Sequence, residues 1–104
     1  MNAERVKEYV NHGFIEWRKH VFQRMLERGI SKNDVKEVLL KGEIVNRYED
    51  DKPFPSALFF KKVNNRPLHT VAALDDVNKK VYIITAYEPS LDLFESDYKT
   101  RKKL

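Results

Sequence analysis

The sequence predicts an α+β fold in which two N-terminal helices pack on one face of a four-stranded antiparallel sheet. Two observations predict it. Apolar residues recur at helical spacing up to Gly42, and beyond Gly42 they fall in short stretches rich in β-branched and aromatic residues. A chain of 104 residues that is 41% hydrophobic has room for one core. We therefore expect a single domain over residues 1–104, with an N-terminal extension at 1–13 and a basic tail at 99–104.

The first helix is predicted by four apolar residues that lie within one sector at about 100° per residue. They are Phe14, Trp17, Val21 and Met25. Gly29 stands where a left-handed C-terminal cap belongs, and Ile30 is then placed to contact Met25, as in a Schellman motif. The helix should end at this glycine.

A second helix should begin directly after the first. Ser31 and Asp34 have the spacing of a capping box, and Gly42 is a natural terminator. The buried stripe consists of Val35, Val38 and Leu39. Two helices with almost no linker between them form a compact corner.

Four strands are expected after Gly42, over residues 43–48, 56–63, 67–75 and 80–87. Asn64 and Asn65 suit a hairpin turn, because asparagine tolerates a positive φ. Apolar residues fall on both faces of these strands, so the face away from the helices also needs a cover or a use.

The turn before the last strand decides which face His69 occupies. A three-residue turn over residues 76–78 places His69 opposite Thr85, on the face that Thr85 shares with Tyr87. A turn of two or four residues moves His69 to the other face. We expect three residues, because Asn78 can adopt the left-handed conformation of a bulged turn.

The composition excludes several classes of function. The chain has no Cys and three His, so neither a disulfide framework nor a metal site is expected, and no cofactor is implied. Its three glycines are isolated and form no phosphate loop. No apolar run approaches the length of a membrane span, and no signal core precedes Tyr9, so we expect a cytoplasmic protein with no membrane partner.

The net charge of +4 comes from the tail. Its basic residues are Lys99, Arg101, Lys102 and Lys103, and the remainder of the chain is balanced in charge. Global charge therefore supports nucleic-acid binding only weakly, and we expect the tail to act as an electrostatic accessory.

Five polar residues are candidates for chemistry. His20 and Arg24 are four apart on the first helix and share a face, so an imidazole that moves protons lies beside a guanidinium that can bind a phosphate. Thr85 and Tyr87 are two apart and present two hydroxyl groups on one strand face. His69 lies among apolar strand residues. Each also has an ordinary structural explanation. His20 and Arg24 can be an incidental surface pair, and Thr85 and Tyr87 are common strand-forming residues. His69 can be a core histidine bonded to the backbone.

Several short blocks together resemble a bacterial family of unknown function, numbered four-two-five-eight in the DUF series. The resemblance covers about residues 14–98. The blocks are Trp17-Arg-Lys-His20, Arg24-Met-Leu-Glu-Arg-Gly-Ile-Ser31, Gly42-Glu-Ile, Asp51-Lys-Pro-Phe-Pro-Ser56, Arg66-Pro-Leu-His69 and Ile84-Thr-Ala-Tyr-Glu-Pro89.

That family looks like a branch of the barnase, EndoU, colicin and RelE-type ribonuclease superfamily. The resemblance implies a RelE/barnase-like fold, metal-independent RNA cleavage by attack of the 2′-hydroxyl on phosphate, and an antitoxin protein as partner. It also implies that the candidate residues form one site. These are His20, Arg24, His69, Thr85 and Tyr87.

Three functions are therefore open. The first is an endoribonuclease that acts as the toxin of a toxin–antitoxin pair, with RNA bound partly by the tail. The second is a non-catalytic module that binds RNA or a protein. The third is a structural domain whose second sheet face forms a homodimer.

Overall fold

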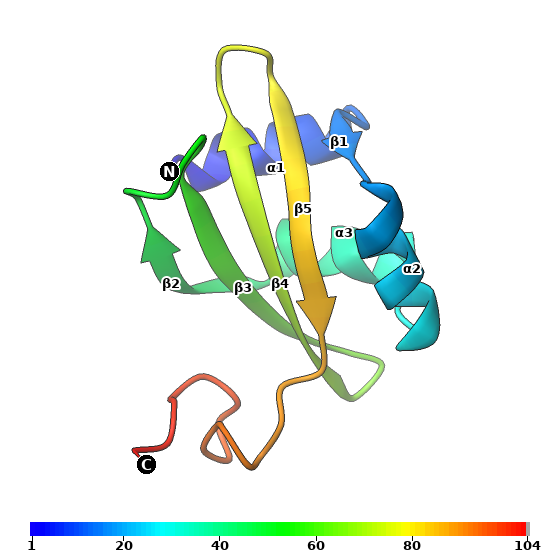
Figure 1. Cartoon of the computed structure of the whole chain (residues 1–104), viewed down its shortest axis with the longest axis vertical. Coiled ribbons are helices and arrows are strands. Elements are labelled where there is room, and N and C mark those ends of the chain that lie inside the picture. The colour runs from blue at the N-terminus through cyan, green and yellow to red at the C-terminus, as the bar shows by residue number, and fades with distance from the viewer. Residues whose placement is uncertain (104) are drawn as a thin grey trace.

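Residues 1–103 are described in the computed structural model, and they form three helices packed on a five-stranded sheet. The strand order is β1-β5-β4-β3-β2 (Figure 1). β1 runs parallel to β5, and the other neighbours are antiparallel. The elements are α1 (Ala3–Asn11), β1 (Ile15–Glu16), α2 (Lys19–Glu27), α3 (Lys32–Lys41), β2 (Glu43–Tyr48), β3 (Ser56–Val63), β4 (Arg66–Asp75) and β5 (Lys80–Tyr87).

The fold is α+β, but the prediction of two helices on a four-stranded antiparallel sheet is wrong. The structure adds a helix before the expected pair and a short parallel strand, β1. Phe14 does not begin a helix, because Gly13 adopts a φ of 77° and the chain then runs extended through Ile15–Glu16. Phe14 is consequently 46% exposed, and the second helix of the fold, α2, begins only at Lys19.

Residues 1–13 were expected as an extension, and most of them form α1. The Asn2 side chain caps its start by accepting from the N–H groups of Glu4 and Arg5. At its other end, the N–H of Phe14 donates to the carbonyl of Tyr9 at 2.8 Å, which closes a Schellman motif on Gly13. The buried residues of α1 are Val6, Tyr9 and Val10.

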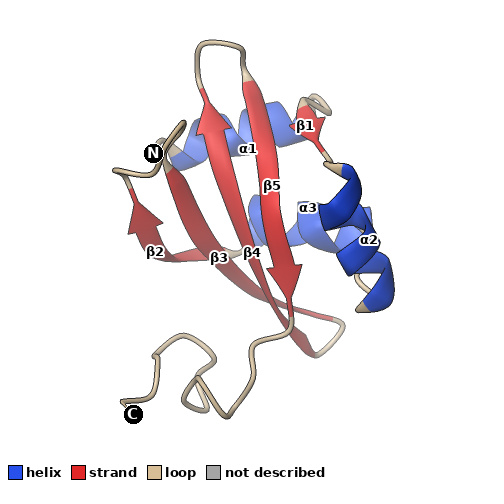
Figure 2. Ribbon diagram, viewed as in Figure 1, coloured by secondary structure: helices blue, strands red, loops and turns tan. Residues whose placement is uncertain are grey.

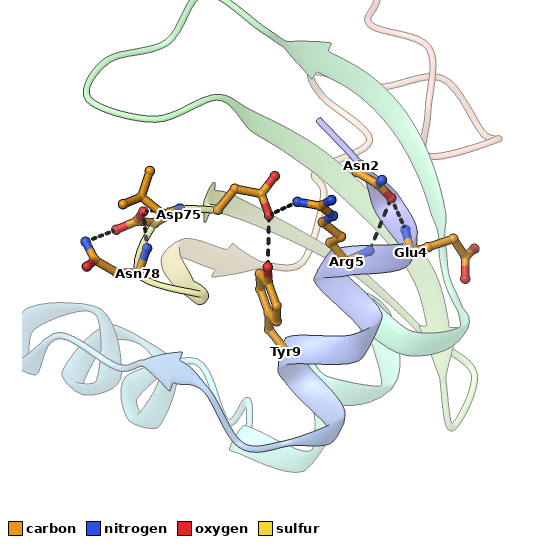
Figure 3. Close-up of polar contacts among 8 residues, drawn as sticks. Asn2, Glu4, Arg5, Tyr9, Asp75 and Asn78 are labelled. Carbon is orange, nitrogen blue, oxygen red and sulfur yellow. Dashed lines mark hydrogen bonds and ion pairs between the residues drawn. The ribbon is translucent and has the colours of Figure 1, made fainter.

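Polar contacts tie α1 to the turn between β4 and β5. The Tyr9 hydroxyl donates to Asp76 Oδ1 at 2.9 Å, and Arg5 Nη1 lies 3.0 Å from the same oxygen. Figure 3 shows Arg5 and Tyr9 extending from α1 toward this turn. Next to it, Asp75 accepts from the backbone and side chain of Asn78, and these bonds hold the pKa of Asp75 below its ordinary value.

The predicted ends of the next two helices are confirmed. Gly29 has a φ of 66°, and the N–H of Ile30 donates to the Met25 carbonyl at 2.8 Å, as a Schellman motif requires. Ser31 and Asp34 form the complete capping box at the start of α3.

The helices lie on one face of the sheet, and the main core is between them and the strands (Figure 2). Its buried side chains include Met25, Val35, Leu39, Phe59 and Ile83. The opposite face is partly covered by residues 88–103, the C-terminal segment, whose Phe94 is 4% exposed. The sequence indicated that this second face needed a cover, and the chain supplies part of it.

The register between β4 and β5 differs from the prediction, although the predicted face is correct. Asp75 pairs with Lys80, not Lys79, so the expected three-residue turn is wrong. A β-bulge then inserts one extra residue, Ile84, between the pairs Ala72–Ile83 and Val71–Thr85. The longer turn alone would place His69 and Thr85 on opposite faces of the sheet, and the extra residue in the bulge brings them back to the same face.

As a result, His69 pairs with Tyr87, whereas the sequence predicted Thr85 as its partner. His69, Thr85 and Tyr87 nevertheless share the sheet face that points away from the helices, as expected.

Candidate functional site

A hollow of about 380 Å³ lies between α2 and the last part of β5. Among residues 1–103, β1 pairs only with Val81 and Tyr82 of β5, so the rest of this edge of β5 has no strand beside it, and α2 packs there instead. We call this cavity the edge hollow. Its lining residues are His20, Val21, Arg24, Arg28, Ile84, Thr85 and Ala86.

The basic side chains of the edge hollow come from one face of α2 and from its C-cap residue, Arg28. His20, Arg24 and Arg28 follow one another at intervals of four residues, so each lies about one turn beyond the last. Arg28 Nη1 donates to the Ala86 carbonyl at 2.9 Å, and within residues 1–103 its other N–H donors have no recorded partner and can meet a ligand. Sequence reasoning missed Arg28, although its spacing from His20 and Arg24 was the signal that could have found it.

Arg24 has one acidic neighbour on α2. Its Nη1 lies 3.7 Å from Glu27 Oε2, and its side chain is 66% exposed. An exposed pair at this distance contributes little, so an incoming phosphate can compete with Glu27 for the guanidinium.

His69 lies outside the edge hollow. It is fully buried beneath the C-terminal segment, and its Nε2 lies 2.6 Å from the backbone carbonyl of Tyr98. A carbonyl only accepts, so Nε2 carries the proton, and Nδ1 accepts from the Tyr87 hydroxyl 3.2 Å away. The rings of Phe60, Tyr87 and Phe94 pack around the imidazole at centroid distances of 4.9–5.7 Å. We call these residues, with Tyr98, the His69 cluster.

Burial sets the electrostatics of the His69 cluster. It lowers the pKa of His69, and the bond to the Tyr98 carbonyl opposes this only in part. Burial also raises the pKa of Tyr87, with a smaller contribution in the same direction from Tyr48 and an opposing one from Arg101. Both groups are therefore neutral near pH 7, and His69 has no free nitrogen to present to a substrate.

The five predicted site residues thus fall into two groups. His20, Arg24 and Thr85 meet at the edge hollow, whereas His69 and Tyr87 bond to each other in the His69 cluster. Thr85 and Tyr87 share a sheet face but line different cavities. His69 is therefore a core histidine bonded to the backbone, which is the structural explanation that its apolar neighbours in the sequence left open.

The basic tail folds back along the C-terminal segment. The guanidinium of Arg101 lies 5.3 Å from the Phe94 ring centroid, and the N–H of Lys102 donates to the Leu93 carbonyl at 2.9 Å. Lys99 pairs with Glu43 at 3.2 Å, and Lys103 is exposed. The last residue of the predicted tail, 104, lies outside the described residues.

A second hollow, of about 340 Å³, adjoins this tail and is lined in part by Tyr48, Tyr87, Lys99 and Arg101. In Figure 1 the C-terminal end lies on the β2 side of the sheet, away from α2. The structure therefore does not bring the tail to the edge hollow, where His20 and Arg24 lie.

Within residues 1–103, no helix is long and apolar enough to cross a membrane. The same residues contain no group of three or more acidic or histidine side chains placed to hold a metal ion.

Fold and cavity together define a small α+β domain with a basic, histidine-containing hollow at an open sheet edge. The chain belongs to the family described as "Domain of unknown function (DUF4258)", which it matches over residues 17–88. The matched segment contains every lining residue of the edge hollow. No curated protein matches the chain. The family resemblance expected from the sequence is confirmed, and the kinship with the ribonuclease superfamily stays a prediction.

Proposed function

We propose that the protein is a metal-independent endoribonuclease and that the edge hollow is its active site. The observation that carries this proposal is the meeting of one imidazole, two guanidinium groups and one hydroxyl in a single cavity. Arg24 and Arg28 supply planar donors that suit phosphate oxygens. His20 supplies an imidazole, whose ring nitrogens can accept a proton and donate it.

The reaction uses a nucleophile that belongs to the RNA. The neutral imidazole of His20 accepts the proton of a 2′-hydroxyl while that oxygen bonds to the adjacent phosphorus. The bond from phosphorus to the 5′-oxygen breaks, and the proton passes from His20 to this leaving oxygen. Arg24 and Arg28 stabilise the negative charge that develops on the phosphate oxygens. The products are a 2′,3′-cyclic phosphate and a free 5′-hydroxyl.

The same proposal includes the biological role that the sequence resemblance implies. The protein acts as the toxin of a toxin–antitoxin pair, and its antitoxin inhibits it by covering the edge hollow. An acidic antitoxin segment would match Arg24 and Arg28 in charge.

The test is cleavage of generic single-stranded RNA in the presence of EDTA. We expect His20→Ala to lose about 10²- to 10⁴-fold in rate, because a positioned proton-transferring group contributes on this scale. Arg24→Lys should also cut slowly, since an ammonium group cannot form the planar two-bond contact. DNA of the same sequence should stay intact, because it lacks the 2′-hydroxyl.

The matched control is His12→Ala. His12 is an exposed histidine at the end of α1, and its Nδ1 bonds the Glu8 carbonyl, so removing it leaves the edge hollow unchanged. Equal activity of wild type, His20→Ala and Arg24→Lys would contradict the proposal, as would the absence of cleavage by the wild type.

A non-catalytic RNA-binding module is the second candidate function. The burial of His69 favours it, because His20 is then the one imidazole in the described lining of the edge hollow and has to serve first as base and then as acid. This module would bind single-stranded RNA through Arg24 and Arg28 without cutting it. Binding by the wild type with no cleavage in EDTA would establish it over the ribonuclease.

A further inference from the structure

Another cavity, which adjoins the edge hollow, has a different chemistry. Its volume is about 240 Å³, and we call it the stacking hollow. It is lined by Arg18, His20, Val21, Pro53, Phe54, Ala73, Tyr82, Ile83 and Ile84. His20, Val21 and Ile84 also line the edge hollow, so the two cavities adjoin at His20.

The stacking hollow is built around a ladder of flat side chains. The rings of Phe54 and Tyr82 lie nearly parallel, with an interplanar angle of 5° and centroids 5.4 Å apart. The guanidinium carbon of Arg18 lies 5.5 Å from the Tyr82 ring centroid. Phe54 and Tyr82 are half-exposed and Arg18 is exposed, so the ladder is in contact with solvent.

These three residues come from separate parts of the fold. Tyr82 lies on β5, on the sheet face away from the helices, and Arg18 is the residue before α2. Phe54 belongs to the loop between β2 and β3, which is anchored by the N–H of Leu74 donating to the Pro55 carbonyl at 3.0 Å. Because the backbone already fixes Phe54 beside Tyr82, a ligand pays little to order the ladder.

We propose that the stacking hollow receives an unpaired nucleobase of the RNA strand whose phosphate lies in the edge hollow, an inference that rests on the proposed function. Aromatic rings and guanidinium planes are the groups on which proteins stack splayed-out bases. Pockets for drug-sized ligands have volumes of about 300–1,000 Å³. The stacking hollow is smaller, so it suits the single ring system of one nucleobase.

The position of His20 connects the two subsites. A nucleotide with its base against Tyr82 has its sugar and phosphate at the shared wall, where His20 faces both cavities. The substrate class is therefore single-stranded RNA, because the bases of a duplex are stacked on one another and cannot enter. Stacking tolerates any base, so the inference predicts little sequence preference at this position.

The experiment measures binding with a probe that cannot be cut: a short 2′-O-methyl RNA with a fluorescent label. We expect Tyr82→Leu and Phe54→Leu each to raise Kd by about 5- to 150-fold, the range that base stacking contributes by substitution. Tyr82→Phe should bind like the wild type, because the ring is retained.

Two controls isolate stacking from charge and from folding. Tyr48→Leu removes a half-exposed tyrosine that lines the hollow beside the tail, and it should leave Kd unchanged. An abasic strand of the same length keeps the phosphates, so wild type and Tyr82→Leu should bind it equally.

An unchanged Kd for both leucine variants would overturn the inference, and so would an equal loss of binding to the abasic strand. The cleavage assay with His20→Ala is read separately. Normal binding by the leucine variants would therefore leave the ribonuclease proposal intact. Absence of RNA cleavage would leave the comparison of Kd values valid.

Discussion

The edge hollow and the His69 cluster contain similar chemical groups in opposite surroundings. Each places an imidazole near a hydroxyl group and close to arginine. His20 is exposed, whereas His69 is fully buried and both of its ring nitrogens are occupied by partners within the chain. Accessibility, and not residue type, therefore decides which histidine can meet a phosphate.

The difference arises over two residues of one strand. Thr85 and Tyr87 point to the same sheet face, but the C-terminal segment covers only the end of β5 that carries Tyr87. Thr85 lies instead at the edge that α2 leaves hollow. One short segment at the end of the chain therefore separates a structural region from a candidate active site.

Stability should separate the two histidines. His69→Ala should lower the free energy of unfolding by about 2–5 kcal/mol, because it empties a packed site and leaves the Tyr87 hydroxyl and the Tyr98 carbonyl without their partner. His20→Ala should change it by about 0.5 kcal/mol or less, as exposed substitutions do. Urea unfolding of both variants measures this, and equal losses would remove the distinction.

The burial of His69 should also make the stability of the fold depend on pH. His69 has a pKa below the ordinary 6.5, so the unfolded chain binds its proton more readily than the folded one. Its contribution to stability is complete above about pH 6.5 and is lost as the pH falls through the lowered pKa of the folded state. Unfolding curves between about pH 7.5 and pH 5 should show a steeper decline for the wild type than for His69→Gln. Parallel declines would show that His69 does not titrate differently on folding.

Thr70 and its neighbour His69 are both buried, but only the side chain of His69 has its hydrogen-bond partners among residues 1–103. The Thr70 side chain faces the helices at 1% exposure, and Oγ1 has no hydrogen-bond partner among residues 1–103. Thr70→Val removes that unpaired oxygen and nearly keeps the shape, so it should raise the free energy of unfolding by about 1 kcal/mol. Thermal unfolding checks this, and a clear loss of stability would mean that the hydroxyl has a partner in solution.

The basic tail should have a small effect on RNA binding. Deleting residues 99–104 would remove the contact between Arg101 and Phe94, so replacing Lys102 and Lys103 by Gln is the cleaner change. If both lysines contact phosphate, the slope of log K against log salt should fall by about 0.7 for each on single-stranded RNA. Anisotropy titrations at several salt concentrations measure the slope. An unchanged slope would make the tail a solvated end.

Much of the sheet could be predicted from the sequence, because its strands are rich in β-branched and aromatic residues and its turns carry asparagine. The Schellman motif at Gly29 and the capping box at Ser31 could be predicted for the same local reason. α1 was missed although Val6, Tyr9 and Val10 have helical spacing between the Asn2 cap and Gly13. β1 could not be found locally, because two residues become a strand only through their pairing with β5.

The candidate site was predictable only in part. The helical spacing of His20 and Arg24 was informative, because a helix fixes which of its residues share a face. The shared face of His69 and Thr85 was predicted through two errors that cancelled, a turn one residue too short and a missed bulge at Ile84. The burial of His69 depends on where the C-terminal segment packs, which no local pattern specifies.

Arginine contacts at the C-terminal end of α2 have a consequence for the kinetics of ligand binding. Arg66 donates to the carbonyls of Arg28 and Gly29 and pairs with Glu88, while Arg28 holds the Ala86 carbonyl. These bonds fasten the end of α2 to the end of β5, so the walls of the edge hollow are already in place before a ligand arrives. Association of a phosphate ligand should then be a single exponential whose rate rises linearly with ligand concentration, without the plateau of a slow conformational step.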